Sequence, residues 1–350
     1  MEQQKILLVG AGIAGVALAR HLDKRNIPFE VIDAGTNHSS RIAAGLINPM
    51  VFRRMAKSWR VDEFLPYAKQ FYAEATTEWG QTYFRPIPIR RAFAHQQEYD
   101  FWVKKQNLEE YQAYLKPLDD SDRDNNQVIN TYGTGEVLNA AYISTKQLLD
   151  DAFKWLQQTK RLRIEKIQYK DIDPQNATYK GEQFAKIIFC EGYHGLENPW
   201  FNYLPLQATK GETITITSED ISNSESLNRK CFTLPVKDTI YRVGATYAWD
   251  DPTLHTTEAA RSELIGHLQN LSSCNFEVID QEAGIRPTVL DRRPLLGKHI
   301  HFPALSIFNG LGTKGYLMAP LLAKEMTDFI LNDKNLDREI DIQRYHKRLL

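Results

Sequence analysis

The feature that most constrains the fold lies near the N-terminus, where an apolar run leads directly into a glycine-rich turn. Ile6–Val9 is continuously apolar, as expected for a parallel strand that is buried on both faces. The turn Gly10-Ala11-Gly12-Ile13-Ala14-Gly15 follows at once and fits the pattern G-x-G-x-x-G. Residues 16–26 then have helical spacing, and Asn26 can end that helix in the left-handed conformation. This order predicts a strand, a tight turn and a helix.

A second strand, residues 28–33, is predicted after the helix and ends in Asp33. The acid therefore comes about twenty residues after the glycines, where it can reach the ribose hydroxyls of an adenosine. Gly10 would make the turn, Gly12 would allow close approach of a pyrophosphate, and the helix N-terminus would attract its charge. The other reading is a glycine-rich turn in an unrelated α/β unit. The cofactor contacts that we predict from this segment are Gly10, Gly12, Ile13, Ala14, Gly15, Asp33 and Ala34.

Asp33 favours NAD or FAD over NADP, because a 2′-phosphate would prefer a basic partner there. It does not separate NAD from FAD. The rest of the chain has to decide between these two cofactors.

A second match to the same glycine pattern, residues 310–315, lies near the C-terminus. A predicted strand precedes it and a predicted helix follows, as in the first case. About twenty residues further on, however, the chain is polar and charged, and no second strand ending in an acid is predicted. We therefore do not expect a second dinucleotide. What remains is a helix N-terminus with Lys314, which attracts negative charge or is a plain helix start with a solvent-exposed lysine.

Composition narrows the class of protein. The 350 residues, 42% of them hydrophobic, are enough for two domains, and a net charge of −1 argues against a large nonspecific nucleic-acid surface. The three cysteines are far apart and the histidines have no ligand spacing, so we predict no metal site. Neither a secretory leader nor an apolar run long enough to span a membrane is evident, which predicts a cytoplasmic protein without membrane contact.

The predicted elements alternate between βαβ segments and β-rich segments, which predicts two interleaved domains. The fold class is α/β with an α+β substrate domain: a Rossmann-type dinucleotide-binding domain and an antiparallel-sheet substrate domain. Residues 285–297, with two prolines, are expected to form a loop. The predicted boundaries are 1–65, 138–205 and 282–350 for the dinucleotide-binding domain, which the resemblance described next makes an FAD-binding domain, and 66–137 and 206–281 for the substrate domain.

Seven segments, taken together, resemble a known family. They are GAGIAG with Asp33, AAGLINP (43–49), IIFCEGYHG (187–195), TKGE (209–212), VGATY (243–247), GIRPTVLDRRPLLG (284–297) and NGLGTKGYLMAP (309–320). In this order and spacing the chain resembles the FAD-dependent D-amino acid oxidase superfamily, which includes glycine oxidase, sarcosine oxidase and the oxidoreductase half of MnmC. The resemblance runs through most of the chain and implies FAD as the cofactor.

The resemblance also implies where the flavin lies. The last segment would cap the isoalloxazine ring, with its helix N-terminus towards the pyrimidine edge. Reduction places negative charge there, so helix amides and the Lys314 ammonium would raise the electron affinity of the ring. Further FAD contacts implied by the resemblance are Arg41, Ala44, Gly45, Leu46, Gly192, Arg286, Gly312, Thr313, Lys314, Gly315 and Tyr316.

Arg286 and Lys314 are the residues that we assign to catalysis. By resemblance Arg286 would bind the substrate carboxylate as a bidentate fork, although an arginine can also tie its loop to a nearby acid. One departure concerns Phe232, which stands where the amino acid oxidases have a carboxylate-binding tyrosine. Tyr241 and Tyr247 are candidates to replace that hydroxyl.

Arg53 belongs to a basic cluster with Arg54, Lys57 and Arg60. Such a cluster is either a solvated face or a site for an anionic substrate, and we include Arg53 among the candidate substrate residues.

The predicted function is an FAD-dependent oxidoreductase that oxidises the C–N bond of an amine or amino acid. A hydride would pass from the α-carbon to flavin N5, and water would then hydrolyse the imine. The predicted partner is a small-molecule amine or amino acid with a carboxylate. One alternative is an MnmC-like removal of a carboxymethyl group from a modified tRNA uridine. Another is a flavin-binding scaffold without turnover.

Overall fold

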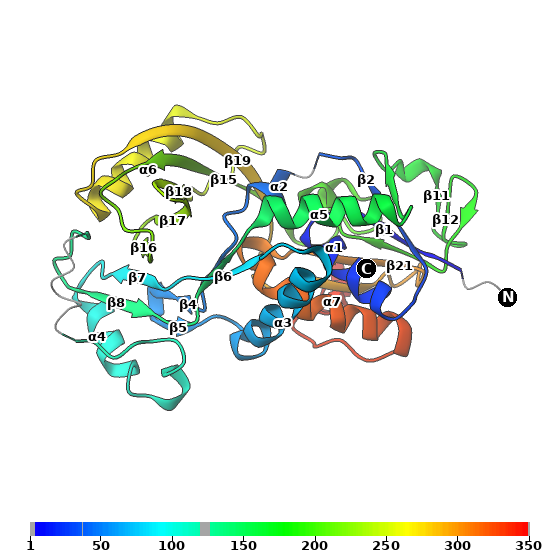
Figure 1. Ribbon diagram of the computed structural model, residues 1–350. Helices are drawn as coiled ribbons and strands as arrows, with labels where there is room; N and C mark the ends of the chain where they lie inside the picture. Colours follow the sequence, from blue (N-terminus) through cyan, green and yellow to red (C-terminus); the bar gives the residue numbers. More distant parts are fainter. Residues whose placement is uncertain (1–3, 37, 120–126, 349–350) are drawn as a thin grey trace. The chain divides into compact units, whose positions relative to one another are not determined.

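The chain forms two compact units, each assembled from several segments (Figure 1). The computed structural model describes residues 4–36, 38–119 and 127–348. Unit 1 comprises Met1–Ala43, Thr145–Thr209 and Ile285–Leu350, and unit 2 comprises Ala44–Ser144 and Lys210–Gly284. Each unit therefore combines segments that are far apart in the sequence, as the prediction of two interleaved domains requires. Residues 44–65, grouped with the first domain in the sequence analysis, pack with unit 2.

Unit 1 is built on a six-stranded sheet in the order β10-β2-β1-β14-β21-β20. Neighbouring strands are parallel except for β20, which pairs antiparallel with β21. This topology is the one that the first glycine turn predicts. The strands are β10 (Leu162–Ile164), β2 (Phe29–Asp33), β1 (Ile6–Val9), β14 (Lys186–Phe189), β21 (Leu305–Asn309) and β20 (Leu295–Lys298).

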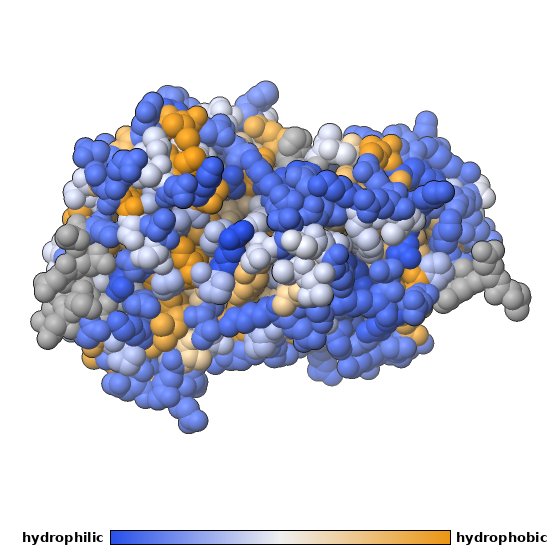
Figure 2. All heavy atoms as spheres, viewed as in Figure 1, coloured by the Kyte–Doolittle hydropathy of each residue, from blue (hydrophilic) through white to orange (hydrophobic). Residues whose placement is uncertain are grey.

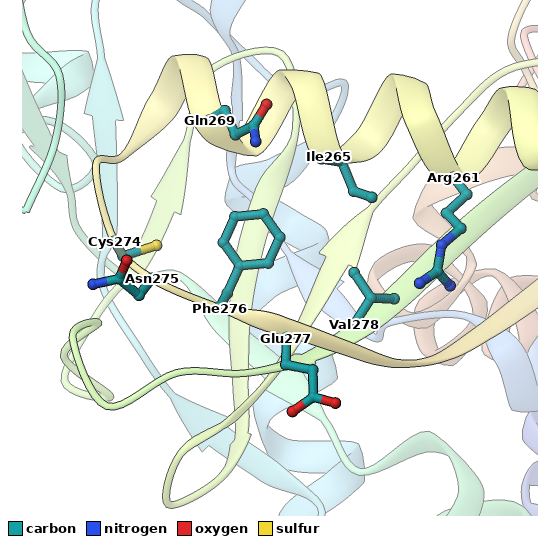
Figure 3. A pocket seen from close by; sticks show the side chains of 8 residues that line it. All are labelled: Arg261, Ile265, Gln269, Cys274, Asn275, Phe276, Glu277 and Val278. Atoms are coloured by element: carbon teal, nitrogen blue, oxygen red, sulfur yellow. The ribbon is translucent and has the colours of Figure 1, made fainter.

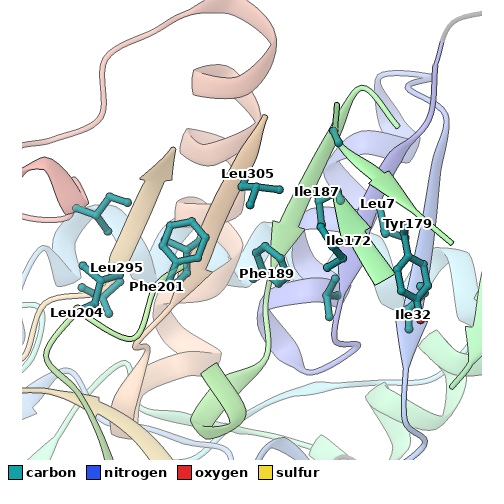
Figure 4. Close-up of a cluster of buried hydrophobic side chains, with 14 of the residues drawn as sticks. Leu7, Ile32, Ile172, Tyr179, Ile187, Phe189, Phe201, Leu204, Leu295 and Leu305 are labelled. Carbon is teal, nitrogen blue, oxygen red and sulfur yellow. The ribbon is translucent and has the colours of Figure 1, made fainter. Parts of the chain in front are cut away.

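One face of this sheet is covered by a small three-stranded sheet, β11 (Ile172–Asp173), β12 (Thr178–Tyr179) and β13 (Glu182–Gln183). Figure 4 shows Leu7 and Ile187 on the main strands beside the small sheet, whereas Leu305 lies further along, near Phe201 and Leu295. Ile172 and Tyr179 from the small sheet complete the cluster, and all of these side chains are buried. Both faces of a parallel sheet must be covered, so this cluster and the helices beside the other face form the core.

Helices α1 (Ile13–Lys24) and α7 (Gly315–Asn332) pack against each other in unit 1 (Figure 1). Ending α1, Asn26 has the predicted left-handed conformation, with φ of 54°. In residues 333–348 no strand follows α7, in agreement with the sequence analysis. The other helical segments of unit 1 are α2 (His38–Ile42), α5 (Thr145–Gln158), η4 (Tyr169–Asp171), η5 (Gly192–Glu197), η6 (Gly312–Lys314) and η7 (Ile342–Arg348).

A mixed seven-stranded sheet dominates unit 2, in the order β19-β15-β18-β17-β16-β7-β8. Helix α6 (Glu258–Leu271) packs on it through buried leucines that meet Ile214, Ile216 and Val243. Its Thr257 cap accepts a hydrogen bond from Ala260 N, as helix N-caps do. The strands are β19 (Glu277–Val289), β15 (Leu206–Thr217), β18 (Ile240–Gly244), β17 (Phe232–Lys237), β16 (Ser226–Asn228), β7 (Ile89–Ala92) and β8 (Thr134–Val137).

The remaining elements of unit 2 are short strands and helices. They are β3 (Leu46–Ile47), β9 (Ala141–Ile143), β6 (Phe84–Pro86), β4 (Met50–Val51), β5 (Ala56–Lys57), α3 (Val61–Trp79), α4 (Gln96–Lys105), η1 (Phe52–Arg54) and η2 (Glu109–Tyr111). On the face drawn in Figure 2, hydrophilic side chains predominate and apolar ones form smaller patches. Within the described ranges, no helix combines the length and the apolar content that crossing a bilayer requires.

The sequence analysis expected residues 285–297 to form a loop, and this was wrong for the first part. Residues 285–289 continue strand β19, and only the following residues leave the sheet before β20. Pro287 is compatible with this because β19 is an edge strand of its sheet, where a missing backbone donor costs little. Arg286 therefore stands on a strand rather than on a loop.

Candidate active site

The first glycine turn is closed by contacts between backbones. A Cβ built on Gly15 would lie 1.9 Å from the Gly10 carbonyl oxygen, and one on Gly10 would lie 2.5 Å from the Cys190 carbonyl oxygen. Gly10 also has φ of +102°, which side chains rarely tolerate. Only glycines allow β1, α1 and the end of β14 to approach this closely.

Asp33 is the last residue of β2. One carboxylate oxygen accepts from the Ala11 amide at 2.6 Å, and the other accepts from the Gly35 amide at 2.7 Å. The carboxylate is therefore held against the first turn, at the edge where a dinucleotide ribose would lie. Ala34 follows directly and is exposed.

The second glycine turn lies beside the first in unit 1. A Cβ on Gly315 would lie 3.4 Å from Ile13 Cγ2, so the starts of α7 and α1 touch. Gly310 and Gly312 have φ of +73° and +55°, and a Cβ on Gly310 would lie 2.5 Å from Val289 Cγ2. This turn thus packs on both the first turn and the strand that carries Arg286.

Two serines on α2 join these elements. The Ser40 hydroxyl accepts from the Ile13 amide at 3.2 Å, and the Ser40 carbonyl accepts from the Tyr316 hydroxyl at 2.6 Å. Its neighbour Ser39 donates to the Ile285 carbonyl at 2.5 Å, one residue before Arg286. The sequence analysis assigned neither serine a role. The two adjacent serines shortly after the second predicted strand were the only sign in the sequence that this segment could hydrogen-bond to the site.

A third turn, after β14, is tied to the second glycine turn by Asn309. Its side-chain amide donates to the Gly192 carbonyl at 2.8 Å and its oxygen accepts from the Gly310 amide at 2.8 Å. Asn309 is buried, so these bonds are protected from water. Gly192 is one of the predicted cofactor contacts, whereas Asn309 is not among them.

Lys314 ends the short helix η6 at the start of α7. Burial lowers the pKa of its ammonium to about 8, because leaving water disfavours the charged form. Burial likewise raises the pKa of Tyr316, whose hydroxyl is engaged with Ser40. A positive charge held in such a place suits a ligand that carries or acquires negative charge.

The two arginines predicted for unit 1 differ in what surrounds them. Arg41 forms an ion pair with Asp150 of α5, which balances its charge. Arg286 is partly buried on β19, next to Ile285, which Ser39 holds. Thr288, two residues on, shares a 2.7 Å hydroxyl contact with Thr209.

The other predicted residues belong to unit 2. Gly45 has φ of +74° and its carbonyl accepts from the Ile143 amide at 3.0 Å, just before Leu46 enters β3. Ala44 precedes it. Phe232 begins β17, and its ring would lie 3.1 Å from a Cβ on Gly244.

Tyr241 requires a correction, because the structure argues against its proposed role in substrate binding. Its side chain is buried in the core beneath α6, and its hydroxyl donates to the Ile221 carbonyl. Such a side chain is a packing residue. Tyr247, in contrast, is 59% exposed and remains a candidate for the missing hydroxyl.

Half of the basic cluster around Arg53 is paired with acidic residues. Lys57 pairs with Asp62 at 2.5 Å, and Arg60 pairs with Glu63 at 2.8 Å. Arg53 itself is exposed on η1 and forms no ion pair within the described part of the chain. Arg54, its neighbour on η1, is likewise exposed and has no ion pair among the described residues, so two of the four cations in the cluster stay accessible.

Unit 2 also has an open groove between α6 and the start of β19 (Figure 3). Ile265 from the helix faces Phe276 and Val278 from the strand side, with Arg261 near one end. None of the predicted site residues lines it. We therefore assign the groove no part in the site.

The chain also matches known proteins in sequence and in structure. The family model described as FAD dependent oxidoreductase matches residues 5–329. The chain belongs to this family of FAD-dependent oxidoreductases. Its cofactor is accordingly FAD, and the predictions of an oxidoreductase fold, FAD and membership of this superfamily are confirmed.

Three relatives of this oxidoreductase cover different parts of it. Glycine oxidase of Bacillus subtilis is 23% identical and aligns with 93% of this chain and 92% of its own length. MnmC of Haemophilus ducreyi is 24% identical, over 55% of this chain and 35% of its own length. The crystal structure of glycine oxidase from Geobacillus kaustophilus superposes with a TM-score of 0.80 at 16% identity, covering 98% and 97% of the two chains.

The residues of unit 1 fit FAD. Gly10 and Gly15 let the first turn close tightly at the start of α1, as a dinucleotide turn does, and Asp33 is bonded to that turn where a ribose would lie. Lys314 and Tyr316 lie on the second turn, which touches the first through Gly315 and Ile13. The adjacency of the two turns suits one extended dinucleotide better than two.

Proposed function

We propose that this oxidoreductase oxidises the C–N bond of an amine or amino acid that carries a carboxylate. The observation that carries the proposal is the meeting, in unit 1, of the dinucleotide turn, the Lys314 turn and the strand bearing Arg286. Ser39 and Ser40 join these three elements by hydrogen bonds. The glycine oxidase of Bacillus subtilis, which aligns over most of the chain, supports an amino acid substrate.

The roles of the side chains follow from their chemistry. Arg286 would bind the substrate carboxylate through its planar fork and so orient the α-carbon. FAD supplies the hydride acceptor when it is bound. Lys314 would hold positive charge beside the ring, in a place where burial strengthens its effect. An unprotonated amine needs no strong base from the protein, and we assign none.

Phe232 makes the substrate pocket differ from one in which a tyrosine hydroxyl assists the arginine. Tyr247, which is exposed, and Arg53, which has no ion-pair partner among the described residues, stay candidate substrate residues by resemblance. Both belong to unit 2. We expect a substrate whose anionic group depends strongly on Arg286.

An MnmC-like reaction on tRNA is the second candidate, favoured by the partial match to MnmC. Unit 2 argues against this candidate. Its Arg90 and Arg91 pair with Glu225 and Glu98 and so do not extend a basic surface. Polyanion binding needs several unpaired cations, whose neutralisation of phosphates makes affinity salt-dependent. We therefore place a small molecule first.

The test is anaerobic mixing of the FAD-loaded protein with amines, N-carboxymethyl amines, amino acids and undermodified tRNA. Loss of the flavin absorbance near 450 nm with a carboxylated amine is the expected result. Bleaching by tRNA alone would replace the first candidate with the second. No bleaching by any member of the panel would overturn the proposed function.

Replacing Arg286 tests its assignment within this reaction. Arg286→Ala should raise KM for the best carboxylated substrate by the equivalent of about 2–4 kcal/mol, because a buried carboxylate would lose its partner. Arg292→Ala is the matched control, since Arg292 is exposed in the same segment. An unchanged KM in the Arg286 variant, with FAD retained, would remove Arg286 from the site.

A further inference from the structure

Glu191 is an acidic residue in the tight turn between β14 and Gly192. Of this turn, only Gly192 is among the predicted cofactor contacts. A Cβ built on Gly10 would lie 3.5 Å from Glu191 Cα, so the backbone of this turn touches the dinucleotide turn. The next residue, Gly192, accepts the hydrogen bond from Asn309 that leads to the second turn. Glu191 thus stands where two parts of the FAD site meet.

The carboxyl of Glu191 is enclosed by two hydrogen-bond donors. The Tyr169 hydroxyl donates to Oε1 at 2.7 Å, and the Asn198 amide donates to Oε2 at 2.9 Å. Asn198 is buried, and its own oxygen accepts from the Trp200 amide at 3.0 Å, which fixes the orientation of its amide. Both partners are therefore held in place by the packing around Phe189 and Trp200.

The charges that face this carboxyl are unfavourable to its ionised form. Glu197 of η5 adds negative charge, Cys190 and Tyr169 are neutral thiol and phenol, and no lysine or arginine pairs with Glu191 among the described residues. Burial raises the pKa of Glu191, and the two hydrogen bonds lower it by less, so the pKa is about 7. An acid that titrates near neutrality at a turn of the cofactor site is unusual enough to need an explanation.

We infer that Glu191 is a positioning residue of the FAD site, which holds the turn against Gly10 through Tyr169 and Asn198 and takes up a proton when the dinucleotide binds. The reason is electrostatic. A pyrophosphate bound at the first turn brings negative charge towards Glu191, and a like charge disfavours a carboxylate. The proton comes from solvent, and no covalent bond of FAD changes.

The hydrogen bonds can follow this protonation. Asn198 can only donate through its nitrogen, so the added proton belongs on Oε1, which faces Tyr169. The tyrosine hydroxyl can turn and accept instead of donating, because it has both capacities. The turn can therefore keep its two contacts in the acid form and in the carboxylate form.

The sign of the pH dependence follows from linkage. FAD raises the pKa of Glu191, so the bound state holds more protons and FAD affinity falls as pH rises through neutrality. A shift of one pKa unit changes Kd by about tenfold across the full window. Glu191→Gln carries no titratable group at this position and keeps both hydrogen-bonding capacities, so its FAD affinity should be nearly constant below pH 7.5, where Lys314 stays protonated.

The experiment measures FAD release from the full-length holoenzyme on dilution, followed by flavin fluorescence between pH 6 and 7.5, below the titration of Lys314. The wild type should show a rise in Kd of about threefold to tenfold, and Glu191→Gln should change by less than about twofold. Glu197→Gln removes the negative charge that faces Glu191, so it should keep the slope but move it to lower pH.

Either a flat wild-type profile or an undiminished slope in Glu191→Gln would overturn the inference. If the variant does not fold, calorimetry of FAD binding to the wild type in two buffers of different ionisation enthalpy decides it. Heats that differ between buffers at pH 6.5, where Lys314 is already protonated, show proton uptake by Glu191, and identical heats exclude it. Neither measurement uses an amine substrate, so failure here is separate from failure of the proposed function.

Discussion

The two glycine turns of unit 1 share one sequence pattern but are packed in different ways. In the first, the contacts that exclude side chains are with backbone carbonyl oxygens, those of Gly10 and Cys190. In the second, the nearest atoms belong to side chains, those of Val289 and Ile13. Backbone cannot move aside as a side chain can, so the same pattern imposes a stricter requirement at the first turn.

This difference explains why one pattern serves two purposes. The first turn joins two parallel strands and α1, and Asp33 is bonded to it. The second turn is a helix start beside that site, carrying Lys314. A glycine pattern therefore marks close approach of the chain, and the neighbouring strand and acid decide whether a nucleotide binds there.

The largest predicted effect separates matched glycines of the two turns. Gly15→Ala should destabilise the protein by more than about 3 kcal/mol and abolish FAD retention, because its methyl group would overlap the Gly10 carbonyl. Gly315→Ala should alter stability by less than about 1 kcal/mol, since Gly315 has helical φ of −54° and its Cβ meets only side chains. Thermal unfolding and the flavin absorbance per chain measure both. Equal losses would mean that the two turns are equally constrained.

An intermediate effect concerns the helices that follow the two turns. His21 of α1 lies 3.0 Å from the Pro320 carbonyl of α7, and its Nε2 must carry the hydrogen because a carbonyl only accepts. Burial lowers the pKa of His21 from 6.5 to about 4. The unfolded chain then binds the proton first, so stability is complete above pH 6.5 and falls as pH decreases towards 4.

The loss attributable to His21 is up to about 3 kcal/mol over that window. His21→Gln keeps a donor for Pro320 without the titration, so urea unfolding at pH 7.5 and pH 4 should show a smaller acid loss than in the wild type. His267→Gln on α6 is the control and should retain the full loss. A wild-type pH profile in the His21 variant would contradict the assignment.

The smallest predicted effect is on the flavin rather than on the fold. Lys314→Met should lower the flavin midpoint potential by about 30 mV, equivalent to about 1.4 kcal/mol for two electrons, because a nearby positive charge favours reduction. Lys324→Met on the same helix, where Lys324 pairs with Asp328, should leave the potential unchanged. The difference should shrink above pH 8, where the Lys314 ammonium loses its proton. Equal potentials in both variants would leave Lys314 a structural residue.

Much of unit 1 could be predicted because its signals are local. The apolar run before Gly10, the helical spacing after Gly15 and the strand ending in Asp33 correspond to β1, α1 and β2. Asn26 even adopts the left-handed conformation that the sequence suggested. Short-range backbone preferences and apolar periodicity determine these features, and both can be read from neighbouring residues.

The errors and omissions concern residues whose roles depend on distant partners. Tyr241 looked like a candidate hydroxyl, but the core beneath α6 buries it. The strand through Arg286 was expected to be a loop, because an edge position that tolerates Pro287 is a property of the assembled sheet. The basic cluster was left open as a solvated face or an anion site, and only the assembled structure shows that Lys57 and Arg60 pair with acids while Arg53 does not.

The sequence alone determined the dinucleotide turn, its acid and the absence of the elements needed for a second nucleotide. Tertiary structure decided that the second glycine turn touches the first, that Ser40 bridges them and that Glu191 lies against Gly10. The physical reason is the range of the interactions. Turn and strand preferences act within a few residues, whereas hydrogen bonds, burial and charge at the site join segments that are 27 to 276 residues apart.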